Sequence, residues 1–173
     1  IKEGNSMGID VKDKLIKYNE EINWIPETVK NGRFGKWLEN ARAWNISSNR
    51  YWSTPIPIWE CDKCHERKVL GSIDEIESVS GVRLTDLHRQ YMDKVEFKCN
   101  CGGTMKRVPE VLDCWFESGS VPFAQKHYPF ENKEWLENHF PSDFIVEYTG
   151  QIRCWFYYLH VLSVALFDKP AYK

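Results

Sequence analysis

Two cysteine pairs constrain the fold of this chain more than any other feature of its sequence. The first pair is Cys61 and Cys64 in CDKC, and the second is Cys99 and Cys101 in CNC. Each pair can supply two thiolates to a tetrahedral ion, and four thiolates are a common ligand set for structural zinc. The stretch between the pairs is too long for one compact loop. The sequence therefore predicts a four-cysteine zinc-binding insertion at residues 60–107.

Disulfides and inert buried thiols are the alternatives for these cysteines. Disulfides are disfavoured because no secretory signal peptide is apparent and the CxC spacing strains a local bridge. CxC is also less usual than CxxC in a zinc site, so His65 and His88 are alternative ligands. The remaining cysteines, Cys114 in DCWF and Cys154 in RCWF, have apolar neighbours and are expected to be core thiols.

Charge and composition exclude several classes of protein. The formal net charge is −2 and the sequence pI is about 6.2, so no global cationic field favours non-specific binding of nucleic acid. Eight tryptophans in 173 residues indicate a core rich in aromatic rings rather than a disordered chain. The longest apolar run, residues 155–167, is too short to cross a bilayer. We therefore expect a soluble cytoplasmic protein without a membrane partner.

Hydrophobic periodicity predicts two helices before the cysteine zone. They cover residues 12–24 and 34–44, and Pro26 is expected to end the first. The two prolines of TPIPIW, residues 54–59, favour an extended or edge segment there. Five tryptophans are expected to be core rings: Trp24, Trp37, Trp44, Trp59 and Trp135.

The cysteine zone itself contains one clear helix signal. Ser72 can cap a helix over SIDEIESVSG, with Glu75 completing a capping box and Gly81 ending the helix. A further helix is expected to begin at Thr85.

A strand followed directly by a helix is predicted near the end of the chain. SDFIVEY indicates a short buried strand, Phe144–Tyr148, and the apolar stretch 149–167 indicates a long helix. In open α/β sheets, ligands bind beyond the carboxyl ends of strands, where the next helix begins. Glu147 and Gln151 are expected there. From spacing alone, Glu147 could equally well bind ribose hydroxyls or simply complement the N-terminus of the helix.

Three blocks of the sequence resemble the isoleucyl-tRNA synthetases, which are class I aminoacyl-tRNA synthetases. The blocks are RFGKWLENARAWNISSNRYWSTPIPIW, VLDCWFESGSVPFAQ and DFIVEYTGQIRCWFYYLHVLSVALFDKPAYK. The order of the WFESG and GQIRCWF blocks around a four-cysteine insertion resembles that family. The similarity covers the chain from about Asp10 onward. In that family the second pair is commonly CxxC, so CNC is interpreted as a one-residue deletion.

The resemblance implies an α/β fold, part of the second half of a split Rossmann-type catalytic domain with a small zinc-binding insertion. Three zones follow. Residues 1–59 would form the exit of an editing insertion with connecting helices, residues 60–107 the insertion, and residues 108–173 the second-half segment. The strand–helix unit would occupy residues 143–167.

The activity implied by the resemblance is that of the whole synthetase. Such enzymes activate isoleucine with ATP and Mg²⁺ to isoleucyl-adenylate and transfer it to tRNA(Ile). The HIGH and KMSKS motifs are absent from this sequence. We therefore expect the chain to be an internal piece of a monomeric enzyme that is inactive alone, with structural Zn²⁺ as its resident metal.

The resemblance also implies which residues bind isoleucyl-adenylate. Glu147 resembles the acidic residue that contacts the adenylate, Gln151 the amide near the substrate amino group, and Trp155 and Trp52 opposite walls of the isoleucine pocket. No nucleophile or acid–base pair is expected, because this chemistry depends on positioning and charge stabilisation. The full implied set is Glu147, Tyr148, Gly150, Gln151, Trp155 and Trp52.

The sequence departs from the family beside the implied pocket. Ser53 and Cys154 stand where the family usually has glycine, and both add atoms there. Two alternatives remain: a piece of a valyl-tRNA synthetase, disfavoured by TPIPIW and WFESG, and a free-standing zinc module that binds nucleic acid. The second alternative predicts a contiguous basic face formed by Lys63, Arg67, Lys68, Lys98, Lys106 and Arg107.

Overall fold

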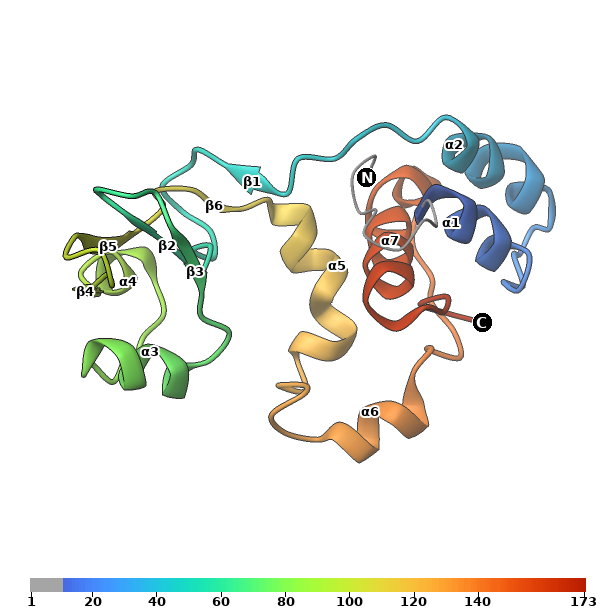
Figure 1. Cartoon of the computed structure of the whole chain (residues 1–173). Helices are drawn as coiled ribbons and strands as arrows, with labels where there is room; N and C mark the ends of the chain where they lie inside the picture. The colour runs from blue at the N-terminus through green and yellow to red at the C-terminus, as the bar shows by residue number, and fades with distance from the viewer. Residues whose placement is uncertain (1–10) are drawn as a thin grey trace. The chain divides into compact units, whose positions relative to one another are not determined.

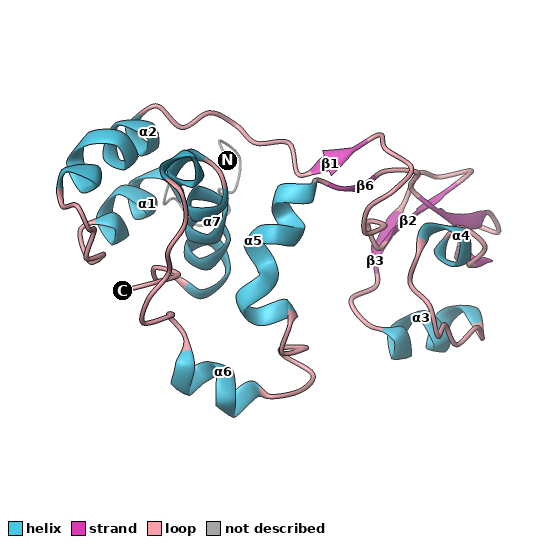
Figure 2. Cartoon of the chain, turned by 180° about the vertical axis from the view of Figure 1, so that it is seen from behind, coloured by secondary structure: helices cyan, strands magenta, loops and turns pink. Residues whose placement is uncertain are grey.

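The computed structural model describes residues 11–173, which form two compact units (Figure 1). The first, which we call the helical unit, contains the described residues up to Trp44 together with Trp115–Lys173. The second, the sheet unit, is Asn45–Cys114. The first ten residues of the predicted zone 1–59 lie outside the described residues. The strands of both sheets belong to the sheet unit, as Figure 2 shows.

The helical unit is built from two segments that are far apart in the sequence. It contains α1 (Val11–Asn19), a π-helical turn η1 (Lys30–Phe34), α2 (Gly35–Glu39), α5 (Cys114–Ala124), α6 (Lys133–His139), a 3₁₀ turn η2 (Thr149–Arg153) and α7 (Trp155–Phe167). α7 lies beside α1 in Figures 1 and 2, and its residues from Phe156 to Val164 are mostly buried. A helix that is apolar on nearly all sides is typical of the centre of a core.

Aromatic rings fill the core of this unit. Trp24 contacts Phe34 at 4.8 Å between ring centroids and Tyr172 at 5.8 Å in an edge-on arrangement. The indole Nε1 of Trp24 donates to Asn19 Oδ1 at 2.8 Å, and Asn19 Nδ2 donates to the carbonyl of Lys30 at 3.1 Å. The buried Asn19 thus satisfies both its donor and acceptor groups, which keeps its burial from being costly.

The sheet unit has two antiparallel sheets. A two-stranded sheet pairs β1 (Ser47–Ser48) with β6 (Val111–Leu112), and a four-stranded sheet has the order β3-β2-β5-β4. The strands of the larger sheet are β2 (Ile58–Cys61), β3 (Arg67–Val69), β4 (Glu96–Lys98) and β5 (Thr104–Arg107), and the unit also contains α3 (Ile73–Ser80) and α4 (Arg89–Met92).

One tryptophan anchors the core of the sheet unit. Trp59 on β2 is fully buried, pairs with Arg107 on β5, and donates from Nε1 to the carbonyl of Val95 at 2.8 Å. Ile76 of α3 and Met92 of α4 belong to the same buried cluster. The strands are only three or four residues long, so this sheet offers little ladder length for its own stability.

The caps of α3 follow the sequence prediction. The Ser72 hydroxyl accepts from the Glu75 backbone N–H at 3.1 Å, and Gly81 ends the helix with φ of 72°. The Glu75 carboxylate accepts from Gly71 N–H rather than from Ser72, so the capping box reaches one residue further back than expected. The helix expected from Thr85 is shorter and begins at Arg89.

The two N-terminal helices are shorter than predicted. α1 ends at Asn19 rather than at residue 24, because the Asn19 side chain bonds to Trp24 and Lys30 across the following turn. The predicted helix 34–44 consists of the π-helical turn followed by α2, which ends at Glu39. The prediction of an extended or edge segment over TPIPIW holds as far as Pro57. It is wrong for Ile58 and Trp59, because these residues belong to β2, which lies between β3 and β5 rather than at an edge.

The predicted strand Phe144–Tyr148 is wrong for this structure. The segment joins neither sheet, and Phe144, Val146 and Tyr148 are 72–74% exposed. An isolated parallel β-bridge joins Ser142, which precedes the segment, to Tyr172. A short apolar run becomes a strand only when a neighbour pairs with its backbone, and the described residues supply none along 144–148.

Burial corrects three further expectations. Cys114 is exposed and Cys154 is only half-buried, so neither is a core thiol. Trp135 is 43% exposed on α6 rather than a core ring, whereas Trp24 and Trp59 are buried and Trp37 and Trp44 pack against the core.

Between residues 11 and 173, no helix has the length and apolar character needed to cross a membrane.

We predict that acid destabilises the helical unit through His160. Burial lowers the pKa of His160 to about 4, although its hydrogen bond to the Leu15 carbonyl at 2.9 Å opposes the shift. The unfolded chain, with a histidine pKa near 6.5, then binds a proton that the folded chain does not. The free energy of unfolding should therefore fall by up to about 3 kcal/mol between pH 6.5 and pH 4.

Urea unfolding at pH 7 and pH 5, followed by far-UV circular dichroism, measures this loss. His160→Leu should remove most of the acid dependence in that interval, whereas replacing the exposed His139 with leucine should retain it. Equal acid dependence in the wild type and His160→Leu would contradict the assignment.

Candidate functional site

The four cysteines of the sequence motif lie together at the ends of two β-hairpins. Cys61 is the last residue of β2, Cys64 lies in the connection to β3, and Cys99 and Cys101 lie in the connection from β4 to β5. All four Sγ atoms lie within 4.8 Å of one another. Among the residues that the structure describes, this is the one cluster of three or more potential ligands.

The two cysteine turns share the same local hydrogen bonding. The backbone N–H of Lys63 donates to Cys61 Sγ at 3.4 Å, and that of Gly103 donates to Cys101 Sγ at 3.4 Å. Each turn places one residue in the left-handed region, His65 with φ of 58° and Gly102 with φ of 80°. The shorter CxC loop therefore presents its sulfurs as the CxxC loop does, and it uses a glycine for the strained position.

A second glycine permits the approach of the two turns. A Cβ on Gly103 would lie 2.5 Å from Cys61 Sγ and 2.8 Å from Asp62 Oδ1. No ordinary side chain fits such a space. The sequence motif CNCGG contains this signal, although the prediction used only its cysteines.

The sulfur positions fit a tetrahedral ion. Cys61 and Cys101 are 3.4 Å apart, and Cys64 and Cys99 are 3.6 Å apart. A zinc ion with Zn–S bonds of about 2.3 Å needs sulfurs separated by about 3.8 Å. The pairs are therefore slightly closer than a bound ion requires, and a small outward movement would accommodate it.

The ionisation of these thiols also favours a cation between them. The N–H groups of Cys64 and Lys63 lower the pKa of Cys61 to about 6. The N–H of Cys101 lowers the pKa of Cys99, but burial and the other three thiols outweigh it and raise that pKa to about 12. The Cys61 thiolate thus opposes ionisation of Cys99, and a divalent cation would remove this repulsion.

The alternative histidine ligands lie outside the cluster. His65 contacts Glu60 Oε1 through Nδ1 at 3.2 Å, and His88 contacts Asp86 Oδ1 at 2.6 Å. The four-cysteine set therefore needs neither histidine.

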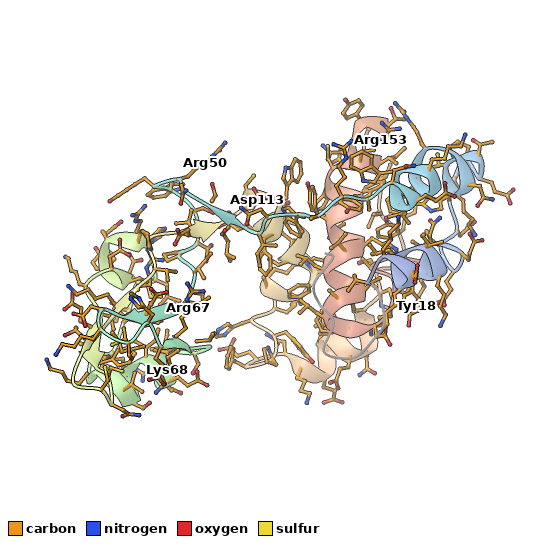
Figure 3. The ribbon with its side chains drawn as sticks, turned by 45° about the horizontal axis from the view of Figure 1, so that its top comes forward. Tyr18, Arg50, Arg67, Lys68, Asp113 and Arg153 are labelled. Carbon is orange, nitrogen blue, oxygen red and sulfur yellow. The ribbon has the colours of Figure 1, made fainter. Side chains whose placement is uncertain are left out.

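The basic residues around the cluster are largely matched by acids. Arg67, labelled in Figure 3 on β3, pairs with Glu60 at 2.6 Å, and Lys106 pairs with Glu96 at 3.7 Å. Arg107 is buried and forms an ion pair with Asp93. Lys68, also labelled, lies over the Phe97 ring at 5.9 Å from its centroid. The contiguous basic face expected of a nucleic-acid-binding zinc module is thus broken by ion pairs.

The blocks that contain WFESG and GQIRCWF contact each other within the helical unit. α5, from the WFESG block, packs on α7, from the GQIRCWF block: the Trp115 ring stacks on Tyr158 at 5.0 Å. The indole Nε1 of Trp155 donates to the carbonyl of Ser118 at 3.0 Å. A Cβ on Gly119 would lie 2.9 Å from the Tyr158 carbonyl, so glycine permits this close approach of two helices.

The predicted polar residues stand at the turn before α7. Gln151 Oε1 accepts from the Trp155 N–H at 3.1 Å and thereby caps the first turn of that helix. The exposed carboxylate of Glu147 accepts from the Tyr148 N–H at 3.2 Å. The Tyr148 ring lies against Gly150, where it occupies the space that a Cβ would need. Arg153, labelled in Figure 3, follows on the same turn.

The structure divides the predicted pocket residues between the two units. Glu147, Tyr148, Gly150, Gln151 and Trp155 belong to the helical unit. Trp52 belongs to the sheet unit, where it is 71% exposed and contacts the His88 ring at 5.3 Å between centroids. A pocket with Trp52 and Trp155 as opposite walls therefore remains a prediction.

Comparison with known families gives one match over nearly the whole chain. The family described as tRNA synthetases class I (I, L, M and V) matches residues 6–173. The match includes both the cysteine turns and the α5–α7 pair.

Curated relatives with high identity are isoleucine–tRNA ligases. The chain is 59% identical over 164 residues to that of Treponema denticola, 58% over 168 residues to that of Nocardia farcinica, and 56% over 168 residues to that of Rickettsia akari. These matches cover 93–94% of this chain but only 15–16% of the relatives.

We predict that Gly103→Ala prevents the cysteines from binding a divalent ion. The added methyl group must displace Cys61 Sγ or Asp62, so the sulfurs can no longer converge. Titration with Co²⁺, followed by the thiolate-to-cobalt absorption, should show at least tenfold weaker binding, which is about 1.4 kcal/mol or more.

Gly71→Ala is the matched control, because its nearest neighbour would be Glu75 Oε2 at an ordinary 3.8 Å. The control should bind Co²⁺ as the wild type does. Wild-type affinity in Gly103→Ala would show that the turns do not depend on this close approach.

Proposed function

The chain belongs to the class I tRNA synthetases, and from this premise we propose that it is an internal segment of an isoleucine–tRNA ligase. The parent enzyme would use ATP with Mg²⁺ to activate isoleucine and would transfer the product to tRNA(Ile). The family match over residues 6–173, with relatives named isoleucine–tRNA ligase, is the observation that carries this proposal. The segment alone would be inactive.

The first proposed contribution of the segment is a structural zinc module. Cys61, Cys64, Cys99 and Cys101 would hold one Zn²⁺ as thiolates. The support is the convergence of the four sulfurs, the close space around Gly103 and the short strands of the sheet. The ion would join the β2–β3 hairpin to the β4–β5 hairpin, and its binding free energy would become folding free energy of the sheet unit.

The second proposed contribution is one side of the isoleucyl-adenylate site, around the turn before α7. The exposed Glu147 carboxylate would accept hydrogen bonds from the ribose hydroxyls. Tyr148, Gly150 and Gln151 would contact the adenylate or the amino acid. The ring of Trp155, which the bond to Ser118 holds in place, would form one wall of the apolar pocket, with Trp52 as the other.

Positioning explains how such a segment would assist the reaction. The indole of Trp155 is fixed to α5, and the amide of Gln151 is fixed to the first turn of α7. Groups held in this way lose little entropy when substrate binds. An apolar pocket distinguishes isoleucine from valine by only about 1–3 kcal/mol for one methylene, which is consistent with an editing insertion elsewhere in the enzyme.

The third proposal concerns the fold of the parent. Residues 108–173 would form part of the second half of a split Rossmann-type domain, with residues 1–59 leading into it. The parallel bridge between Ser142 and Tyr172 supports this, as do the hydrogen bonds from Ser142 N to Ala171 O and from Lys173 N to Ser142 O.

The free-standing nucleic-acid module is the less favoured alternative. It requires a continuous basic face, but three of the six candidate cations pair with Glu60, Glu96 and Asp93. The family match also extends across both units. A valyl-tRNA synthetase segment belongs to the same family, but the relatives reported above are isoleucine–tRNA ligases.

We predict one zinc ion per chain, whose removal selectively unfolds the sheet unit. Metal analysis after purification without added zinc should give one equivalent. Chelation should then abolish slow amide exchange in β2 and β5, whereas α7 in the helical unit, which has its own buried core, should remain protected.

Cys61→Ser should reproduce the effect of the chelator, and Cys114→Ser, which changes an exposed cysteine outside the cluster, should not. Full protection of β2 and β5 in metal-free protein would contradict a structural role for the ion.

The function itself can be tested by transplanting the chain into a relative. Replacing the matched segment of the Treponema denticola isoleucine–tRNA ligase with this sequence should give an enzyme that catalyses isoleucine-dependent ATP–pyrophosphate exchange. Glu147→Gln should lower kcat/KM about 10- to 100-fold, because a hydrogen bond to a charged group contributes about 1.5–3 kcal/mol.

Glu137→Gln is the matched control, since Glu137 is an exposed carboxylate on α6 that pairs with Lys133 at 3.9 Å. It should leave kcat/KM unchanged. A stable chimera that activates valine in preference to isoleucine would support the valyl alternative, and one that activates neither would refute the proposed function.

A further inference from the structure

The segment Arg50–Ile56, which carries Trp52, is held at both ends by arginines. Near its start, Arg89 Nη1 donates to the carbonyl of Arg50 at 3.2 Å, and the Arg89 guanidinium lies over the Tyr51 ring at 5.1 Å from its centroid. At its end, Arg107 Nη1 donates to the carbonyl of Ile56 at 3.3 Å. The two arginines come from α4 and β5. Arg50 lies beyond β1 in Figure 3.

Asp93 joins the two arginines. Its Oδ2 accepts from Arg89 Nε at 3.0 Å, and its Oδ1 accepts from Arg107 Nε at 2.6 Å. Nη2 of Arg107 also contacts Oδ1. One carboxylate therefore neutralises and orients both guanidinium groups, and each guanidinium still has a donor for the segment.

The Arg107 side chain is entirely buried, which makes its partner important. Its exposed fraction is 0%, and besides Asp93 it contacts the carbonyls of Ile56 and Glu110. A buried guanidinium requires a carboxylate and several acceptors at once. The orientation of Arg107 is thus set by Asp93, and the position of Ile56 follows from it.

Trp52 itself lies beside the start of α4. Its ring contacts His88, the residue that directly precedes α4, and Asp93 directly follows α4. Further bonds fix the backbone beside the ring: the Ser53 hydroxyl donates to the Leu112 carbonyl at 2.8 Å, and Leu112 N–H donates to the Thr54 carbonyl at 2.7 Å. Trp52 nevertheless remains 71% exposed, so its side chain is accessible to a ligand.

We propose that Asp93 is a positioning residue, which sets the place of the Trp52 ring through Arg89 and Arg107. The inference rests on the proposed function in so far as Trp52 is a wall of the isoleucine pocket. The proposed metal module would then also help to position Trp52. β5 runs directly from the Cys99–Cys101 turn to Arg107, so the sheet that the metal would stabilise carries one of the two arginines.

The test compares Asp93→Asn with wild type in the metal-loaded chain by nuclear magnetic resonance. Loss of the carboxylate should abolish the nuclear Overhauser contact between the Trp52 and His88 rings. It should also speed amide exchange of Ile56, which donates to Glu110 O at 3.4 Å, about tenfold. The contact between Trp59 and Phe97, whose centroids lie 6.1 Å apart in the same unit, should persist.

Asp74→Asn is the matched control, because it removes an exposed carboxylate of the same unit that pairs with Arg83. It should change none of these signals. Unaltered Trp52–His88 contact in folded Asp93→Asn would overturn the proposal, and so would simultaneous loss of the Trp59–Phe97 contact, which would indicate a merely structural role.

A second variant covers failure of Asp93→Asn to fold, since that change leaves Arg107 buried without its carboxylate. Arg89→Gln removes the more accessible arginine and leaves the Asp93–Arg107 pair in place. It should weaken the Trp52–His88 contact and preserve the Trp59–Phe97 contact. An unchanged Trp52–His88 contact would overturn the proposal.

Kinetics in the transplanted enzyme separate this proposal from the proposed function. Asp93→Asn should raise KM for isoleucine about tenfold while kcat changes less than about twofold, as expected when binding alone is weakened. If the Trp52 ring moves and KM does not change, the positioning role holds and the assignment of Trp52 to the isoleucine pocket fails.

Discussion

The close approach of four sulfur atoms is the constraint on which the sheet unit depends. Thiols that lie within 4.8 Å of one another cannot all ionise without a cation, as the opposite pKa shifts of Cys61 and Cys99 illustrate. The strands that carry them are three or four residues long, and the remaining core is a small cluster around Trp59. A site that gathers both hairpins at one point would therefore contribute a large share of the stability of this unit.

The helical unit depends on a different principle, the burial of one apolar helix. α7 is surrounded on most sides, and several polar side chains of this core bond to backbone carbonyls: Trp155 to Ser118, Tyr172 to Phe156, and His160 through Nε2 to Leu15. The contrast between the units has a physical origin. A long helix brings many side chains into contact at once, whereas short hairpins need a cross-link.

The sequence was most informative where local chemistry determines the outcome. The Ser72 and Gly81 caps and the extended backbone before β2 could be predicted because each depends on nearby residues, and the two cysteine motifs that the structure brings together were visible as well. The predictions failed where the secondary structure of a segment depends on residues distant in the sequence or on side-chain bonds across a turn. Phe144–Tyr148 has the composition of a buried strand but no pairing partner among the described residues, and α1 ends early because Asn19 bonds to Trp24 and Lys30. The roles of Gly119 and Asp93 depend on contacts across the fold, so no local pattern indicated them.

The pairing of β1 with β6 has an entropic consequence for the whole chain. Ser47 lies opposite Leu112, so the chain enters and leaves the sheet unit at neighbouring points. For the helical unit, the folded stretch Asn45–Cys114 thus behaves as a connection of only a few residues. The entropy of closing a loop grows with the logarithm of its length, and replacing some seventy flexible residues by about four saves about 2.5 kcal/mol. Folding of the sheet unit therefore lowers the entropic cost of bringing α2 and α5 together within the helical unit.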